Sequence, residues 1–321
     1  MPDLFAEVVH TSRAYLRDSL SHAGHALGLW HALADPVPLP QLAERVHVSP
    51  QRLRPVLEAM RCQGWVETDE CDAWQVVGAI PDDTTVIKLG WGLLGEVLHD
   101  DIPLDPFTGL EVRDAKLAWH IYQARVHADP AVELASALKT QQPLRILDAG
   151  GGSGVWSSAL MRACPEATTT IIDDADTLAI AAALLDQADA AGAPGLRART
   201  LLHAADLRQE LGVGGFDLVL LAHVLHLLGP SDAAAVVGTC VRALRPGGQL
   251  VMIDLALDAN RRGPETALWF AVDMAIYTPA GRVYEERELQ QLLEDRSMEV
   301  IQNMTLTSAP DTCVLLAQRP A

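Results

Sequence analysis

The chain has 321 residues, of which 49% are hydrophobic, and a formal net charge of −18 at pH 7. That length predicts about two domains of ~150 residues each, and the acidic balance argues against a nucleic-acid binder and against docking on an anionic membrane. Five cysteines without a C-x-x-C pair, no signal-peptide pattern and no apolar run of ~18 residues favour a cytoplasmic protein without a membrane span.

Residues 1–82 are predicted to form a small, mostly helical domain that ends in a β-hairpin. Ser49 and Pro50 are typical of a helix start, and Gly64 is typical of a helix end. Helices are expected at 25–33, from 39 onward and at 51–63, and short strands at 65–67 and 74–76. This order of elements predicts a winged-helix-like domain.

The winged-helix pattern has two interpretations. The helix at 51–63 carries Arg52, Arg54 and Arg61, which would suit DNA recognition by a metabolite-sensing regulator. The acidic chain favours the alternative, a domain that packs against a partner subunit. A helical connector is expected to follow at 83–142, and a cofactor-binding domain at 143–321.

From residue 144 onward strands alternate with helices, which predicts an α/β domain with a mainly parallel sheet. The expected strands lie at 144–148, 168–173, 197–203, 216–222 and 247–254. Two further strand-like runs, 299–307 and 312–318, are joined by a short turn that contains proline. We therefore expect a C-terminal hairpin, in which one strand runs antiparallel to the sheet.

Residues 146–154 read Ile-Leu-Asp-Ala-Gly-Gly-Gly-Ser-Gly, between an apolar strand and an expected helix at 155–163. Strand, glycine turn and helix form a nucleotide-cofactor site at the carboxyl edge of a doubly wound sheet, because glycine lets the backbone approach a ligand closely. A dinucleotide fingerprint needs a third glycine where this chain has Ser157. A tight turn without a ligand is the simpler alternative.

Two acids favour one cofactor at this turn. Asp148 closes the strand, where its charge would repel a phosphate but suits the ammonium and sulfonium of S-adenosylmethionine. Asp173 ends the next strand, at the spacing where an acid accepts hydrogen bonds from ribose hydroxyls. The two acids together predict S-adenosylmethionine as the cofactor, and no metal.

The chain resembles, over nearly its whole length, the S-adenosylmethionine-dependent O-methyltransferases of the plant caffeate and bacterial antibiotic type. The matching motifs are 147–154, 217–228, Arg245-Pro246-Gly247-Gly248, Asp273-Met274 and Gly281-Arg282. The resemblance implies a class I methyltransferase sheet with an antiparallel C-terminal hairpin. It also implies a homodimer formed through the N-terminal winged-helix-like domain, and a small-molecule substrate.

The resemblance assigns roles to cofactor-binding residues. Gly150 and Gly152 fall where the family wraps the methionine part of the cofactor, and Asp173 falls on the ribose-binding acid. Asp206 falls on the acid that accepts from the adenine amino group, and Leu207 on the apolar residue against the ring.

His226 falls on the family's catalytic histidine, and Asp254 falls where the family usually has a glutamate beside it. Methyl transfer needs alignment of the acceptor oxygen with the methyl carbon, ~3–3.5 Å apart, and removal of a phenolic proton. A histidine suits that role near neutral pH, and an acid on its other nitrogen would fix the tautomer. A buried core histidine on an apolar helix is the alternative interpretation.

Several positions depart from the family pattern. Ala222 replaces a lysine under the adenine, Leu227 and Leu228 replace an acid and a tryptophan, and Val283 replaces a second glutamate. A family member that binds the cofactor but runs a cyclisation, decarboxylation or hydroxylation therefore stays an alternative. His223, expected one helical turn before His226, is an extra candidate base.

A substrate-pocket wall is expected on one further helix, because five side chains there share a helical face. They are Trp269, Phe270, Asp273, Met274 and Tyr277. An apolar, aromatic wall suits a planar substrate, although core packing or a dimer surface would produce the same pattern. The sequence thus predicts an O-methyltransferase that acts on a small aromatic or polyketide-like natural product.

Overall fold

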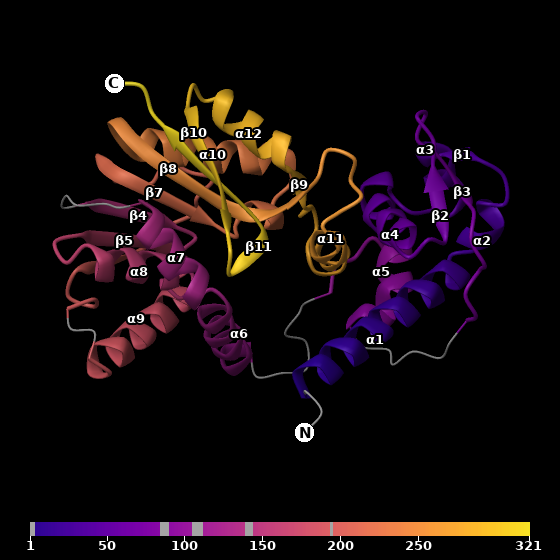
Figure 1. Cartoon of the computed structure of the whole chain (residues 1–321), viewed down its shortest axis with the longest axis horizontal. Coiled ribbons are helices and arrows are strands. Elements are labelled where there is room, and N and C mark those ends of the chain that lie inside the picture. Colours follow the sequence, from indigo (N-terminus) through magenta and orange to yellow (C-terminus); the bar gives the residue numbers. More distant parts are fainter. Residues whose placement is uncertain (1–3, 84–89, 105–111, 139–143, 193–194) are drawn as a thin grey trace. The chain divides into compact units, whose positions relative to one another are not determined.

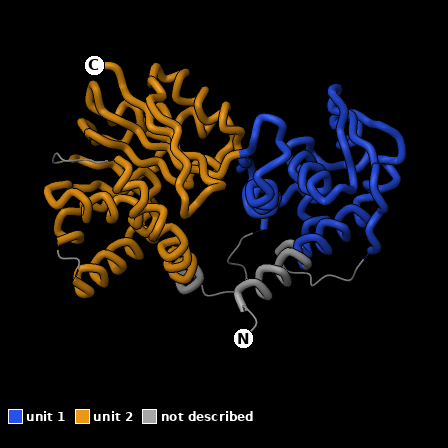
Figure 2. Tube along the Cα trace, viewed as in Figure 1, with its two compact units in different colours: residues 1–106, 257–283 blue, residues 107–256, 284–321 orange. Residues whose placement is uncertain are grey.

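The computed structural model describes residues 4–83, 90–104, 112–138, 144–192 and 195–321. The chain divides into two compact units (Figure 2). Unit 1 comprises Met1–Pro106 and Leu257–Val283, and unit 2 comprises Phe107–Ala256 and Tyr284–Ala321. The predicted connector is thus divided between the units, and parts of it lie outside the described residues. The segment Leu257–Val283 joins unit 1, although the sequence suggested one continuous C-terminal domain.

Unit 1 is helical, with a small antiparallel sheet in the order β1-β3-β2. Its helices are α1 (Leu4–Ala26), α2 (Leu29–Ala32), α3 (Leu39–Arg45), α4 (Pro50–Cys62), the 3-10 helix η1 (Gly90–Leu93), α5 (Leu94–Asp100) and α11 (Glu265–Tyr277). Its strands are β1 (Val37–Pro38), β2 (Val66–Thr68) and β3 (Ala73–Val76). The predicted hairpin is therefore present as β2 and β3.

The helix expected at 25–33 is in fact two helices. Gly28, between α1 and α2, has a φ of 68°, a left-handed conformation that glycine adopts without a Cβ penalty. The helical spacing of the apolar residues continued across this break, so the sequence pattern alone suggested one element.

Helix α4 forms much of the core of unit 1, and α11 packs against it. The predicted face of α4 is fully buried, at Leu53, Val56, Leu57 and Met60. From α11, Trp269, Val272 and Ile276 join the same cluster. Apolar contact therefore explains why Leu257–Val283 folds with unit 1.

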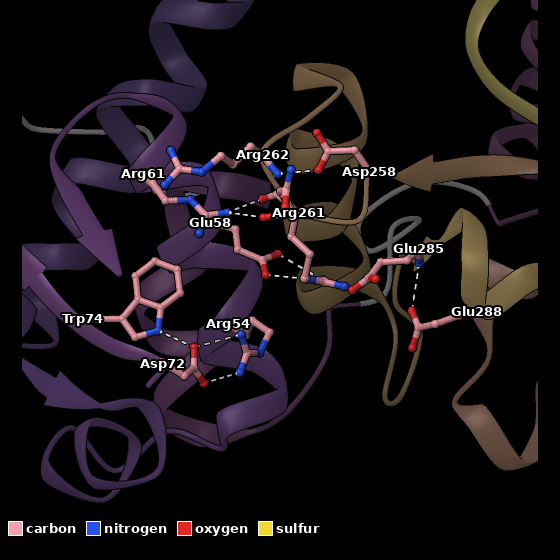
Figure 3. Close-up of polar contacts among 11 residues, drawn as sticks. Arg54, Glu58, Arg61, Asp72, Trp74, Asp258, Arg261, Arg262, Glu285 and Glu288 are labelled. Atoms are coloured by element: carbon pink, nitrogen blue, oxygen red, sulfur yellow. Dashed lines mark hydrogen bonds and ion pairs between the residues drawn. The ribbon is translucent and has the colours of Figure 1, made fainter. Parts of the chain in front are cut away.

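The arginines of α4 bond to neighbouring parts of unit 1, as Figure 3 shows for Arg54 and Arg61. Arg52 and Arg61 are buried; Arg52 donates to the carbonyl oxygen of Ala275, and Arg61 donates to that of Arg261. Arg54 pairs with Asp72, at 2.5 Å.

A buried ion pair joins α4 to the segment before α11. Glu58 of α4 has a side chain that is 1% exposed, and it pairs with Arg261 at 2.5 Å and 3.1 Å (Figure 3). The charges of Glu58 and Arg261 compensate one another inside unit 1, as burial of charge requires.

Unit 2 contains one large sheet in the order β10-β11-β8-β7-β4-β5-β6, with β9 paired to β8. Its strands are β4 (Arg145–Ala149), β5 (Thr168–Asp173), β6 (Thr200–Ala204), β7 (Phe216–Ala222), β8 (Leu244–Leu257), β9 (Tyr284–Glu285), β10 (Glu299–Leu306) and β11 (Ala309–Gln318). Strands β4 to β8 are parallel, and β11 is antiparallel to both β8 and β10. The predicted parallel sheet with an antiparallel C-terminal hairpin is confirmed.

Helices cover both faces of this sheet (Figure 1). They are α6 (Val112–Val126), α7 (Ala128–Leu138), α8 (Val155–Ala163), α9 (Ala175–Ala190), the 3-10 helix η2 (Leu225–Leu227), α10 (Pro230–Ala243) and α12 (Glu286–Glu294). Alternate residues of β7 face opposite sides: Val219 and Leu221 pack with α10 and α12, while Leu218 and Leu220 pack with α7, α8 and α9. Among the described helices, none is long and apolar enough to cross a membrane.

The strand order places a ligand crevice at one point of the sheet. Strand β4 lies between β5 and β7, so the chain turns to one side after β4 and to the other side later. In open α/β sheets ligands bind outside the carboxyl ends of the strands at this switch point. The glycine turn follows β4 at that position.

Candidate functional site

The glycine turn after β4 is packed too tightly for a side chain at Gly150 or Gly151. Gly150 has a φ of 69°, and a Cβ there would lie 2.5 Å from Cγ2 of Val224. A Cβ at Gly151 would lie 2.6 Å from Cγ of Asp148. The peptide N–H of Gly150 donates to the carbonyl oxygen of Ile172, at 2.8 Å. The turn therefore presents bare backbone at the crevice, as a cofactor cradle requires.

Asp148 lies beneath this turn. The residue is 1% exposed, and its Oδ2 accepts a hydrogen bond from Ser157 Oγ at 2.5 Å. Its Oδ1 is buried without a hydrogen-bond partner among the described residues. Burial raises the pKa of Asp148 to about 6. Sequence reasoning considered Ser157 only as a missing glycine, and did not find that it holds this carboxyl.

Asp173, at the end of β5, is fixed by two backbone donors. It accepts from the N–H of Gly152 at 2.9 Å and from the N–H of Asp174 at 2.8 Å. Burial raises its pKa, and the two hydrogen bonds partly oppose that effect. Asp174 in turn caps α9, because its Oδ1 accepts from the N–H groups of Asp176 and Thr177. A hydrogen bond thus links the glycine turn to Asp173 at the end of β5.

A pocket of about 500 Å³ opens beside this structure. It is lined by Gly150, Asp173, Asp174, Ala205, Asp206, Leu207, Arg208, Val224, Leu228 and Val236. Four of the predicted cofactor residues therefore share one pocket.

Of the predicted cofactor residues, Asp206 is ion-paired and Ala222 is buried in the sheet. Asp206 is paired with Arg208 through contacts of 2.8 Å and 3.0 Å, and its hydrogen bonds from Arg208 lower its pKa. Ala222, at the end of β7, is 8% exposed, belongs to the sheet core and pairs with Ile253 of β8.

The two predicted catalytic residues meet beyond the end of β7: His226 lies in η2, and Asp254 lies within β8, which continues to Leu257 and does not end at Asp254 as expected. Nδ1 of His226 lies 2.7 Å from Oδ1 of Asp254, and the N–H of His226 donates to Oδ2 at 3.2 Å. The N–H of Leu255 also donates to Oδ1, at 2.9 Å. Burial acts to raise the pKa of Asp254, but the charge and hydrogen bonds of His226 outweigh it and hold that pKa below its usual value. Asp254 is therefore an ionised acceptor for the imidazole.

The expected helical relation between His223 and His226 is wrong. His223 has a φ of 57°, and only the three residues Leu225–Leu227 form a helical turn, of the 3-10 type. The chain leaves β7 through this left-handed residue, which turns both imidazoles toward Asp254: His223 Nδ1 lies 4.0 Å from Oδ1 of Asp254. The apolar residues around His226 had suggested a helix.

Aromatic side chains surround His223. Its ring stacks on that of His127 with centroids 4.3 Å apart, and the Trp156 ring lies 6.0 Å away. Burial lowers the pKa of His223 to about 3, so this imidazole is neutral near pH 7. Its Nε2 has no hydrogen-bond partner among the described residues. Sequence reasoning missed His127, which lies far from any recognised motif.

The donor atoms of His223, His226 and Asp254 lie within 4.8 Å of one another, a combination that can also hold a metal ion. The short contact between His226 and Asp254 gives the group a second interpretation, as a proton-handling pair.

The five residues expected to form a pocket wall lie on α11, in unit 1. Trp269 and Tyr277 pack with the core that contains α4, and Nε1 of Trp269 donates to Glu265. Phe270 and Met274 belong to a second cluster, with Leu257, Ala267, Leu268, Ala271 and Val283. Asp273 is partly exposed. The side chains therefore do not form one uniform face, which supports the core-packing alternative for Trp269.

A family model of the O-methyltransferase domain matches residues 120–298. The chain is 28% identical over 178 residues to 3-hydroxy-5-methyl-1-naphthoate 3-O-methyltransferase of Streptomyces sahachiroi, covering 56% of this chain and 50% of that relative. It is 24% identical over 309 residues to the tetracenomycin polyketide synthesis 8-O-methyltransferase TcmO of Streptomyces glaucescens, covering 87% and 86%. The match thus spans about half the length of the first relative and most of the second.

Solved structures share the fold. An O-methyltransferase family 2 protein from Planctomyces limnophilus, in complex with apigenin, superposes with a TM-score of 0.78 at 19% identity, covering 95% of this chain and 93% of that one. Human N-acetylserotonin methyltransferase, in complex with S-adenosylmethionine, gives a TM-score of 0.59 at 17% identity, covering 100% and 99%.

Members of this family depend on S-adenosylmethionine, and the residues of this chain fit that cofactor. At Gly150 and Gly151 the turn leaves no room for a Cβ, and the neighbouring pocket is lined by acids and apolar side chains, which suit a ligand that carries ribose hydroxyls and an adenine ring. The family match covers more than half of the chain and the fold agrees with it, so the chain belongs to the S-adenosylmethionine-dependent O-methyltransferase family.

Proposed function

We propose that this protein transfers a methyl group from S-adenosylmethionine to a hydroxyl group of a small aromatic or polyketide-like molecule, with His226 as the general base. The observation that carries the proposal is the 2.7 Å contact between His226 and the buried Asp254. Val224 and Leu228, which flank the turn of His226, line the pocket beside the glycine turn. The base therefore lies next to the proposed cofactor site.

The tautomer of His226 follows from its partner. An ionised carboxylate only accepts hydrogen bonds, so Nδ1 must carry the proton, and Nε2 then has the basic lone pair. When bound, S-adenosylmethionine supplies a methyl carbon activated by its sulfonium. Nε2 of His226 would take the proton of the acceptor hydroxyl as that oxygen is methylated. Asp254 stabilises the resulting imidazolium because it carries the opposite charge.

The cofactor-binding residues have separate roles in this proposal. Asp173 accepts hydrogen bonds from the ribose hydroxyls, Asp206 accepts from the adenine amino group, and Leu207 packs against the adenine ring. The Cβ-less backbone of Gly150 and Gly152 follows the methionine part. Asp148 acts from beneath the turn, where its charge favours the cofactor's ammonium.

A second candidate is a cofactor-dependent reaction without methyl transfer. The chain is 28% identical over 293 residues to aclacinomycin 10-hydroxylase RdmB of Streptomyces purpurascens, covering 82% of this chain and 75% of that relative. Leu227 and Leu228 stand where the family usually has polar or aromatic residues, and Leu227 is 49% exposed. Product mass separates the candidates, since only methyl transfer adds a methyl group to the substrate.

A DNA-binding regulator has less support. Arg52 and Arg61, which would have read DNA, are buried and donate to carbonyl oxygens within unit 1. Arg54 is paired with Asp72. We infer instead that the N-terminal helices contribute to a homodimer.

The test of the base uses His226→Ala with His99→Ala as a control, because His99 is an exposed histidine of unit 1. Methyl transfer to a panel of phenols is measured by mass spectrometry, and affinity for S-adenosylhomocysteine by calorimetry. We expect His226→Ala to lower the rate by ~10²–10⁴ with nearly unchanged affinity, and His99→Ala to change neither. Asp254→Asn should lower the rate less, because the base itself stays.

The pH profile gives an independent check. Only the neutral imidazole accepts a proton, so the wild-type rate should rise with pH, and this rise should vanish in His226→Ala. A near-wild-type rate in His226→Ala would show that His226 is structural. A bound cofactor without any methylated product would favour the second candidate.

A further inference from the structure

Helix α6 directs two basic side chains along one face, and a third follows its last residue. Lys116 and His120 are one helical turn apart, and His127 comes directly after the helix ends at Val126. Positions four and eleven residues apart lie on the same side of a helix. All three residues belong to unit 2, the unit that also contains the cofactor pocket.

These side chains lie over successive parts of the site. Nζ of Lys116 is 3.5 Å from Oδ1 of Asp174. His120 Nδ1 lies 3.4 Å from the position of a Cβ on Gly152. The ring of His127 stacks on that of His223. One side of α6 thus lies over Asp174 of the pocket, over Gly152 of the glycine turn and over His223.

The charges at the glycine turn suit only one of the two charged groups in the cofactor's methionine part. Asp148, Asp173 and Asp174 surround it, and three carboxyl groups suit the ammonium of the cofactor's methionine part. They repel its carboxylate, which needs a basic or N–H partner. Arg208, a cation that also lines the pocket, is already paired with Asp206 at 2.8 Å.

Lys116 and His120 are placed to supply that partner. Both side chains are partly buried, and the His120 ring has no hydrogen-bond partner among the described residues. Lys116 is also within reach of the turn's acids, since its 3.5 Å contact with Asp174 is long and Asp174 is 55% exposed. A neutral imidazole donates one N–H, and an ammonium donates three.

We propose that Lys116 and His120 are positioning residues that hold the carboxylate of the cofactor's methionine part from the α6 side of the glycine turn. This inference rests on the proposed function, because it takes S-adenosylmethionine to be the ligand. Holding the carboxylate fixes the methionine chain, and therefore the direction in which the methyl group points. The contact of His127 with His223 attaches the same segment to the catalytic pair.

The test compares two ligands that differ in the proposed contact. S-adenosylhomocysteine has both the amino-acid carboxylate and the ammonium, whereas 5′-methylthioadenosine has the same nucleoside and thioether without either. Loss of a basic or N–H donor side chain removes a partner of the carboxylate and not of the ammonium. Calorimetry on the full chain measures both affinities for wild type, Lys116→Ala and His120→Ala. A matched control is Arg125→Ala, which removes an exposed positive charge from another side of α6.

We expect each variant to weaken S-adenosylhomocysteine binding about 10- to 100-fold, the effect of one hydrogen bond to a charged group. Affinity for methylthioadenosine should change less than about threefold, and Arg125→Ala should affect neither ligand. His120→Gln, which retains an N–H donor, should recover part of the lost affinity. The nearly unchanged affinity of His120→Ala for methylthioadenosine would show that this variant is folded.

Two results would overturn the inference. Equal weakening of both ligands would mean that α6 only packs over the site, and unchanged binding of both would mean that the carboxylate lies elsewhere. If wild type binds neither ligand, the proposed function itself is wrong. This outcome is distinct from a failure of the inference, because it is seen in the wild type before any variant is compared.

Discussion

Replacing Asp148 with asparagine should stabilise unit 2 at neutral pH. Asp148 is fully covered by the glycine turn, and burial raises its pKa from 3.8 to about 6. A carboxyl whose pKa is raised by folding favours the folded state fully below pH 3.8, and this contribution is lost as pH rises through 6. Near pH 7.5 the wild type therefore holds an unfavourable buried charge, which Asp148→Asn removes.

The size of the effect follows from the two pKa values. Each pKa unit corresponds to about 1.4 kcal/mol, so ionisation of Asp148 costs unit 2 about 3 kcal/mol at pH 7.5. At pH 4.5 linkage gives a cost of about 1 kcal/mol. The stability difference between Asp148→Asn and wild type should therefore grow by about 2 kcal/mol between these pH values. Ser157 Oγ can still donate to the amide oxygen of the variant.

Native-state hydrogen exchange is the suitable assay, because the chain has two units and a global unfolding curve would mix them. The amides of β4 and α8 report the opening of unit 2 around Asp148. Asp186→Asn is the control, since Asp186 has a side chain that is 68% exposed, and it should show no such growth. Equal pH dependence in wild type and Asp148→Asn would refute the reasoning. We also expect the stabilised variant to bind S-adenosylhomocysteine more weakly, a trade between stability and function.

Two other predictions concern unit 1. Glu58→Gln should lower its stability by about 3–5 kcal/mol, because it leaves the buried Arg261 without its counter-charge. Glu67→Gln, which breaks the exposed pair with Arg262, should change it by less than about 1 kcal/mol; similar losses for the two variants in native-state hydrogen exchange of the α4 amides would contradict this. Light scattering on the full chain should give twice 34.6 kDa, and a clean monomer would count against the inferred homodimer.

Local sequence patterns predicted the sheet of unit 2 well. Strands β5 and β7 and helix α8 have the expected bounds, because β-branched and apolar residues mark the strands and Gly154 and Pro165 flank the helix. The antiparallel hairpin was also visible as two strand-like runs around a short turn. Such signals are local, so a single sequence suffices to detect them.

The departures arise where backbone handedness or a contact across the fold decides the structure. Helical spacing continued through Gly28, and only its left-handed backbone separates two helices. The left-handed His223 likewise interrupts an apolar pattern that resembled a helix. His120 carried no motif, because its importance comes from the approach of α6 to Gly152 across more than thirty residues of sequence. Neither backbone handedness nor a contact across the fold is encoded in apolar spacing.

The discontinuity of unit 1 has a consequence for its synthesis. Its core includes Trp269, Val272 and Ile276, and the buried guanidinium groups of Arg52 and Arg61 find their carbonyl partners only in Leu257–Val283. A growing chain makes α4 early but makes this segment after five strands of the large sheet. Until then the N-terminal helices expose apolar side chains, and Arg52 and Arg61 lack these carbonyl partners. Unit 1 therefore completes its folding late, and a chain truncated before Leu257 should aggregate, although its first hundred residues are intact.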